Sequence, residues 1–180
     1  SQAGWMGGDY QAKITVDTIA HIKEKFDIAV FVKGVNVGAD AERCIDAGAD
    51  VVWVSNHGGR QLDHTRACID ALPEVAAAVA GRVPVIVDGG FMRGADVLKG
   101  LCLGADIVAM GRLEGLSMAA AGSAGLVKAL KLVETELRLS MALLGVADIA
   151  DLNGELVQRS EALGQSNVLS AFPLLENLKV

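Results

Sequence analysis

Four short apolar runs, each followed by a stretch of helical periodicity, constrain the fold of this chain more than any other feature. Continuous apolar runs are typical of parallel strands, because such strands are buried on both faces. The runs lie at residues 28–32, 51–54, 83–87 and 107–110, and the helical stretches at 39–47, 68–80, 95–103 and 119–144. A further helix is predicted over 15–26, with Thr15 as its N-cap. The pattern predicts an α/β fold built from four βα units.

Two of the junctions before strands carry the same three residues. Gly48-Ala49-Asp50 precedes the second apolar run, and Gly104-Ala105-Asp106 precedes the fourth. Glycine is favoured where a helix ends in a left-handed turn, so each triplet is predicted to end a helix. This internal repeat supports the interpretation as βα units.

Residues that could take part in catalysis or ligand binding follow the ends of the predicted strands. They are Lys33, Ser55, His57, Arg60, Asp88, Gly111 and Arg112. Both a (β/α)8 barrel and a doubly wound sheet bind ligands at the carboxyl ends of their strands, so position alone does not separate the two folds. A doubly wound nucleotide-binding domain would be expected to carry G-x-G-x-x-G after its first strand, and that motif is not found there.

The segment from Ser55 to Asp63, S-N-H-G-G-R-Q-L-D, brings a histidine and an arginine within three residues of each other. A proton acceptor and a guanidinium on one rigid loop suit a small carboxylate substrate whose neighbouring carbon must lose a proton. The two glycines between His57 and Arg60 let the backbone approach a ligand closely. The segment therefore favours an enzyme that acts on a small organic acid.

Composition narrows the class of partner and the location. A formal net charge of −6 without a basic cluster argues against a nucleic-acid surface. The apolar residues are spread over short runs, so no membrane span of about 20 residues is predicted. The three cysteines lack metal-ligand spacing and predict buried, reduced thiols in an intracellular protein, with no metal site. We expect a cytoplasmic protein, although a peroxisomal or peripheral membrane location fits the same features.

Several segments together resemble the FMN-dependent L-2-hydroxy-acid dehydrogenases and oxidases, the family of glycolate oxidase, lactate oxidase and mandelate dehydrogenase. The matching segments are 32–35, 55–63, 88–90, 93–94 and 110–112, and they occur in the family's order. The resemblance runs from about Thr15 to Asn153 and rests above all on 55–63. Family members are longer, and this chain is similar to their C-terminal half, strands five to eight of a (β/α)8 TIM barrel.

Four βα units do not close an eight-stranded barrel, so the resemblance implies that a second polypeptide or an N-terminal half completes it. A dimer of half-barrels is a further alternative, and we expect a homo- or hetero-oligomer. Residues 1–14 are predicted to be an N-terminal segment whose start at Ser1 is a cut or a processed end. Residues 15–150 are predicted to form the half-barrel, and residues 151–180 a C-terminal tail.

The resemblance implies catalytic roles for Lys33, His57 and Arg60. His57 is the implied base, which takes a proton from the substrate while two electrons pass to the flavin. Arg60 is the implied clamp for the substrate carboxylate, and Lys33 is the cation that stabilises reduced flavin. The order in which the substrate's protons leave stays open. The implied FMN-binding residues are Lys33, Ser55, Asp88, Gly89, Gly90, Arg93, Gly111 and Arg112.

Two residues depart from the family pattern at the phosphate end of the implied FMN site. Met92 stands where the family has an arginine that contacts the phosphate, and Leu113 stands where it has a proline. Losing one cation near a dianionic phosphate costs about 1 to 3 kcal/mol of binding. Arg93 matches the next family position, which is normally turned elsewhere, and its rotation toward the phosphate would compensate.

The leading hypothesis is the FMN-dependent oxidation of an L-2-hydroxy acid, such as lactate, to the 2-oxo acid. The alternative is a non-catalytic or regulatory subunit derived from such an enzyme, which Met92, Leu113 and the missing half motivate. A third hypothesis is another flavin-barrel reaction on the same carbanion chemistry, either isomerisation or oxidative decarboxylation. The sequence fixes neither the substrate's side chain nor the electron acceptor.

Overall fold

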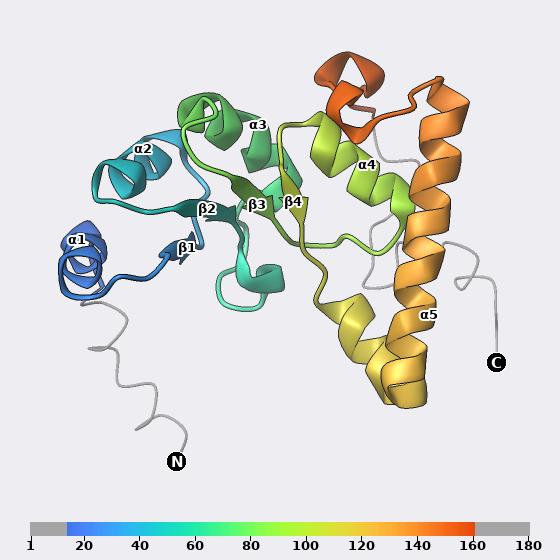
Figure 1. The fold of residues 1–180 in the computed structure, drawn as a ribbon, viewed down its shortest axis with the longest axis horizontal. Helices are drawn as coiled ribbons and strands as arrows, with labels where there is room; N and C mark the ends of the chain where they lie inside the picture. Colours follow the sequence, from blue (N-terminus) through green and yellow to red (C-terminus); the bar gives the residue numbers. More distant parts are fainter. Residues whose placement is uncertain (1–13, 161–180) are drawn as a thin grey trace. The chain divides into compact units, whose positions relative to one another are not determined.

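The computed structural model describes residues 14–160, which fall into two compact units (Figure 1). The first unit holds the residues up to Gly89 together with Gly104–Ala109. The second holds Gly90–Leu103 and the residues from Met110 onward. The predicted segments 1–14 and 151–180 lie largely outside the described residues, so the predicted division of the chain stays a prediction.

A parallel four-stranded sheet in the order β1-β2-β3-β4 forms the centre of the first unit. Because the strand order follows the sequence, each connection is a crossover of the βαβ type. This arrangement confirms the predicted α/β fold. The strands are β1 (Phe31–Lys33), β2 (Val51–Val54), β3 (Val85–Val87) and β4 (Ile107–Val108).

Three of the strands are shorter or begin later than predicted. At the amino ends of β1 and β3, an aspartate side chain accepts a hydrogen bond from a backbone amide. The Val30 amide donates to Asp50 Oδ2 at 2.7 Å, so the regular ladder of β1 begins only at Phe31. The Val85 amide likewise donates to Asp106 Oδ2 at 2.7 Å at the start of β3. The two aspartates of the repeated triplets therefore close the amino ends of the strands beside them.

Helices α2 (Gly38–Asp46) and α3 (Cys68–Val79) cover one face of the sheet (Figure 1). The side chains beneath them are almost fully buried, and Val52, Val54 and Val87 are each 0% exposed. Helix α1 (Val16–Lys25) begins with a capping box between Thr15 and Thr18, which confirms Thr15 as its N-cap. The core of the first unit is therefore the sheet-to-helix layer that the apolar runs predicted.

The opposite face of the sheet carries one row of residues across all four strands. Lys33, Trp53, Ile86 and Ile107 are successive partners in the parallel ladders. Ile107 is 49% exposed, and Phe31, on the same face of β1, is 54% exposed. This face is thus exposed at the edge strands β1 and β4, whereas Ile86 of β3 is only 5% exposed.

The second unit is built around two packed helices. Helices α4 (Gly94–Cys102) and α5 (Arg112–Leu144) contact each other, and a Cβ at Gly94 would collide with the backbone of Leu137. The short 3-10 helices η4 (Ile149–Asp151) and η5 (Gly154–Leu156) follow. The core of this unit consists of Leu98, Cys102 and Met141, with Leu137, Val146, Leu152, Leu156 and Val157 packed around them.

Helix α5 differs from the sequence prediction in two ways. It begins at Arg112 instead of residue 119, and its backbone breaks at Ala121 and Gly122, where Gly122 has φ 57°. It also contains an 18-residue window with a mean hydropathy of 1.4, so by length and composition alone it could cross a membrane, although no span was predicted from the sequence. Length and composition alone are weak evidence for a span, because long helices of soluble proteins meet the same criteria.

Candidate functional site

The ammonium group of Lys33 lies where three strands of the first unit end. Its Nζ donates to Ser55 Oγ at 2.8 Å and lies 3.1 Å from Asp88 Oδ2. The same Nζ lies 5.2 Å from the centroid of the Trp53 ring, within the range of a cation–π interaction. The structure therefore brings Lys33, Ser55 and Asp88 together, as the sequence predicted.

Buried polar atoms without a partner surround this cluster. Asp88 Oδ1, Trp53 Nε1 and Asn36 Oδ1 are buried and have no hydrogen-bond partner among the described residues. Buried polar atoms in native proteins are nearly always satisfied, so such atoms mark a place for a ligand or for further polypeptide. A ligand that offers hydroxyl donors to Asp88 and negative charge to Lys33 fits this cluster, and the hydroxylated chain and flavin ring of FMN have both properties.

The loop after β2 holds His57 in an unusual backbone conformation. His57, Gly58 and Gly59 form the 3-10 turn η3, and His57 has φ 57°, in the left-handed region that residues other than glycine seldom adopt. The His57 amide donates to Ser55 Oγ at 3.2 Å, and the Gly59 amide donates to Asn56 Oδ1 at 3.1 Å. These bonds fix the turn, and they leave the His57 side chain exposed.

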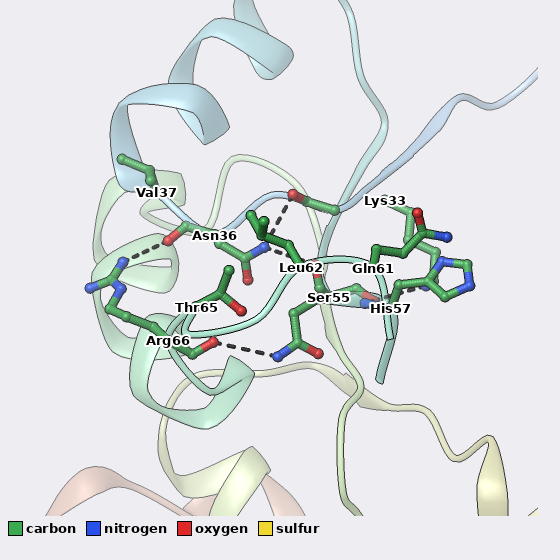
Figure 2. Close-up of a pocket in the computed structure, with 11 residues that line it drawn as sticks. Lys33, Asn36, Val37, Ser55, His57, Gln61, Leu62, Thr65 and Arg66 are labelled. Atoms are coloured by element: carbon green, nitrogen blue, oxygen red, sulfur yellow. Dashed lines mark hydrogen bonds between the residues drawn. The ribbon is translucent and has the colours of Figure 1, made fainter. Parts of the chain in front are cut away.

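A pocket of about 530 Å³ opens beside this loop (Figure 2). Lys33, Ser55 and His57 line it together with residues of the loops after β1 and β2. His57 and Arg66 lie at opposite ends of the pocket in Figure 2. His57 and Lys33, the predicted base and the predicted flavin cation, both line this pocket, and their roles stay predictions.

Arg60 does not line this pocket, contrary to the expectation that it would face the same cavity as His57. It follows the η3 turn and is exposed, and its guanidinium has no hydrogen bond or ion pair with any described residue. The physical reason is that no group in this unit holds its guanidinium. Its role as a carboxylate clamp stays a prediction.

Arg93 is held by a carboxylate of its own unit. Its Nη2 lies 2.6 Å from Glu136 Oε1, and its Nε donates to both oxygens of Glu136 at 2.8 and 3.0 Å. The hydrogen bond from Arg93 lowers the pKa of Glu136, and Glu136 in turn raises the pKa of Arg93. A rotation of Arg93 toward a phosphate would break this pair, so the arginine does not simply replace the cation missing at Met92.

The amides at the start of α4 and just before it are also occupied. The Met92 and Arg93 amides both donate to Asp96 Oδ2, at 3.2 and 3.0 Å, and the Gly94 amide donates to Glu136 Oε2 at 2.8 Å. The other predicted phosphate residues of this unit, Gly90, Gly111 and Arg112, are exposed. Their convergence with Asp88 and Gly89 of the first unit stays a prediction.

Sequence analysis missed two asparagines that organise the site. Asn36 Nδ2 donates to the carbonyl of Ser55 at 2.8 Å, and the Asn56 amide donates to Cys68 Sγ at 3.1 Å. Asn56 stands inside the motif, and its position before two glycines was the available signal for a turn-forming side chain. Cys44, Cys68 and Cys102 are free and buried, as predicted, and burial raises the pKa of each thiol.

The parallel βα units, the lysine at the end of β1 and the histidine loop after β2 are the features in which this chain resembles the flavin-dependent hydroxy-acid enzymes. The chain matches the model of the FMN-dependent dehydrogenase family over residues 1–159, and it belongs to that family. This confirms the resemblance that the sequence motifs indicated, and FMN is the cofactor that the family shares.

Curated relatives and solved structures agree with this assignment. The chain is 42% identical over 144 residues to a 2-hydroxyacid oxidase of Dictyostelium discoideum, which covers 80% of the chain and 37% of that protein. It is 46% identical over 140 residues to an L-lactate oxidase of Lactobacillus jensenii, covering 78% of the chain and 34% of that protein. A crystal structure of the monotopic membrane protein (S)-mandelate dehydrogenase matches with a TM-score of 0.81 and 34% identity, over 88% of the chain and 42% of that protein.

The chain therefore spans less than half the length of these relatives. Its four βα units agree with a partial (β/α)8 barrel, which is the fold class that the sequence predicted. The family includes a member that associates with membranes, as the mandelate dehydrogenase shows.

Proposed function

We propose that the protein to which this chain contributes oxidises an L-2-hydroxy acid to the 2-oxo acid with FMN as the cofactor. The observation that carries this proposal is the cluster of Lys33, Ser55 and Asp88 at the strand ends, beside a pocket that His57 also lines. Family membership supports the reaction class.

FMN, when bound, would supply the acceptor for the electron pair that leaves the substrate. Lys33, Ser55 and Asp88 are the residues of the first unit that would hold it. Asp88 Oδ1 has no partner among the described residues and could accept a hydrogen bond from a hydroxyl group of FMN. Gly89 has φ 106°, and a Cβ built on it would lie 3.0 Å from Cys68 Sγ, so this turn of the loop suits glycine. Gly90, Gly111 and Arg112 would contact the phosphate, with Arg93 engaged elsewhere.

The remaining steps belong to side chains of the histidine loop. The exposed His57 imidazole would take the proton that the substrate loses, and its pocket position beside Lys33 supports that role. Arg60 would turn toward the pocket and bind the substrate carboxylate in a bidentate manner. No partner among the described residues opposes that turn, because its guanidinium is exposed and unpaired there.

A second polypeptide or an N-terminal half would complete the barrel, and we propose a cytoplasmic or peripheral membrane location for the whole protein. The alternative of a non-catalytic subunit is not favoured, because the relatives are named as two oxidases and a dehydrogenase.

The test uses the chain together with the polypeptide that completes the barrel, loaded with FMN. Lactate, glycolate or mandelate should bleach the visible absorption of the flavin under anaerobic conditions. His57→Gln should slow bleaching by about 100-fold or more, since it removes the base. His21→Gln, on the exposed surface of α1, is the matched control and should bleach at the wild-type rate. A wild-type complex that binds FMN but is bleached by none of the three acids would contradict the proposal.

A further inference from the structure

We propose that Arg66 is a positioning residue, which fixes the base of the loop that carries His57 and Arg60. This inference rests on the proposed function, because it assigns Arg66 a task in that reaction. Arg66 touches neither of the predicted catalytic side chains in the contacts of the described residues. It acts through the backbone on which they are mounted.

The guanidinium of Arg66 joins two other elements to the end of the loop. Its Nη2 donates to the carbonyl of Asn36 at 2.6 Å, and its Nη1 donates to Glu74 Oε2 at 2.8 Å (Figure 2 draws the first bond). Asn36 lies in the connection after β1, and Glu74 lies on α3. Two donors of one planar group thus hold two fixed acceptors, which a single ammonium group does less well.

Asn36 closes the arrangement, because it also holds the beginning of the same loop. Its Nδ2 donates to the carbonyl of Ser55 at 2.8 Å, while its own carbonyl accepts from Arg66. The side chain of Asn56 adds a direct link, since its Nδ2 donates to the carbonyl of Arg66 at 3.4 Å. Both ends of the segment 55–66 are therefore fastened to one residue and to each other.

The segment between these ends has little else to order it. Every residue from His57 to Ala67 is exposed, and Leu62 is 68% exposed, so apolar burial contributes little. His57 also holds a left-handed backbone conformation that costs free energy unless the surroundings fix it. The polar contacts at the base of the loop are thus what sets the place of the imidazole.

Glu74 keeps the arrangement charged and anchored to a second helix. Its Oε1 accepts from the Gly38 amide at 2.9 Å at the start of α2, and this bond, followed by Arg66, lowers the pKa of Glu74. Arg66 and Glu74 are each about half exposed, at 48% and 45%. A pair so exposed contributes little to global stability, so its removal should loosen the loop without unfolding the chain.

The experiment compares Arg66→Met with Arg43→Met, a control that removes an exposed arginine of α2 paired only with Asp40 at 3.6 Å. In the chain alone, amide hydrogen exchange at Gly59 should be about tenfold faster in R66M than in R43M. In the FMN-loaded complex, kcat with the best of the three acids should fall about tenfold in R66M. The Kd for FMN and the melting temperature should match those of R43M. Arg66→Lys should recover part of both losses.

Two results would overturn the inference, and a further outcome would overturn the proposed function. Equal Gly59 exchange and equal kcat in R66M and R43M would overturn the inference while leaving the proposed function intact. Parallel losses of FMN affinity, melting temperature and kcat would show a general structural role and would also overturn it. If R66M does not fold, Glu74→Gln replaces it, because it weakens the bond between Arg66 and Glu74 and keeps Arg66 bonded to Asn36. If the wild-type complex oxidises no acid, the proposed function fails, and so does the catalytic part of this inference. The exchange data would still show whether Arg66 holds the base of the loop.

Discussion

At the scale of single residues, the phosphate end of the predicted FMN site has fewer free cations than its sequence suggests. Met92 carries no charge, and Arg93 gives its guanidinium to Glu136 through contacts of 2.6 to 3.0 Å. Within the described part of the second unit, Arg112 is the predicted phosphate residue that keeps its charge unpaired. The phosphate group should therefore contribute less to flavin affinity in this protein than a second free arginine would allow.

Met92→Arg should correct this shortage. The resemblance places this position at the phosphate, so a guanidinium here should add a contact while Arg93 stays on Glu136. The Kd for FMN should then fall about tenfold, equivalent to about 1.4 kcal/mol. The Kd for riboflavin, which lacks the phosphate, should not change. Quenching of flavin fluorescence in titrations of the completed barrel measures both constants. Met92→Leu controls for side-chain volume, and an equal gain for FMN and riboflavin would refute the electrostatic explanation.

At the scale of secondary-structure elements, Glu136 of α5 joins the amino end of α4. It accepts from the Gly94 amide at 2.8 Å and from the Arg93 side chain, and these bonds lower its pKa. Because the folded-state pKa is depressed, the stabilisation is fully present above the unfolded pKa of about 4.3 and is lost as the pH falls through the folded value.

Glu136→Gln should therefore destabilise the chain by about 1 kcal/mol at pH 7, after allowing for the partial exposure of the pair. The difference from the wild type should shrink toward pH 3, where the wild-type carboxylate also takes up a proton. Urea unfolding at several pH values measures it. Glu134→Gln is the matched control, because Glu134 forms an exposed i,i+4 pair with Arg138 and should give little change. A pH-independent difference would contradict this account.

The repeated Gly-Ala-Asp triplets show both the reach and the limit of the sequence pattern. Glycine at the helix ends was predictable, and Gly48 and Gly104 do adopt φ values of 99° and 101°. The task of each aspartate was not, because it depends on which strand lies alongside, and that is known only after the sheet has formed. The bounds of β2 match the predicted run, whereas β1 begins later than its apolar run, where the Val30 amide donates to Asp50.

The two triplets also lead to a test. Asp106→Asn and Asp50→Asn should each lower the melting temperature by a few degrees, because each weakens a 2.7 Å bond to the amide at or just before a neighbouring strand. Asp50→Asn should have the larger effect at neutral pH, since Asp50 also accepts from Lys23 at 2.9 Å. Calorimetry of both variants against Asp46→Asn, an exposed residue of α2, would check the order. A wild-type melting temperature in either variant would argue against the strand-closing role.

The candidate site divides along similar lines. Lys33, Ser55 and Asp88 lie together because consecutive parallel strands end on one edge and carry these residues there, and their roles toward a flavin stay predictions. The orientation of Arg60 was not predictable, since a loop side chain without a partner takes its direction from groups outside this chain's described residues. The engagement of Arg93 depends on Glu136, forty-three residues further along the chain, a separation that no local motif records.

At the scale of the whole molecule, helices α2 and α3 cover one face of the sheet in the first unit, and the edge strands are exposed on the other face. Within the described part of the chain, β1 and β4 each pair with a single strand, and Phe31 and Ile107 remain about half exposed. Unpaired strand edges and an apolar face favour association with further polypeptide. The row of Lys33, Trp53, Ile86 and Ile107 is therefore expected to become interior when the barrel is completed.

Ile107→Glu should separate the stability of this chain from the assembly of the barrel. The side chain is already 49% exposed, so the isolated chain should tolerate the change with little loss of melting temperature. In a closed barrel the same carboxylate would be buried without a partner, which costs several kcal/mol and should weaken association with the completing polypeptide by about 100-fold or more. Co-elution in size-exclusion chromatography measures this, and Leu143→Glu, at a side chain of α5 that is 90% exposed, is the control. Equal association of both variants would mean that this face stays in water, and the flavin site would then have to be completed from the loops alone.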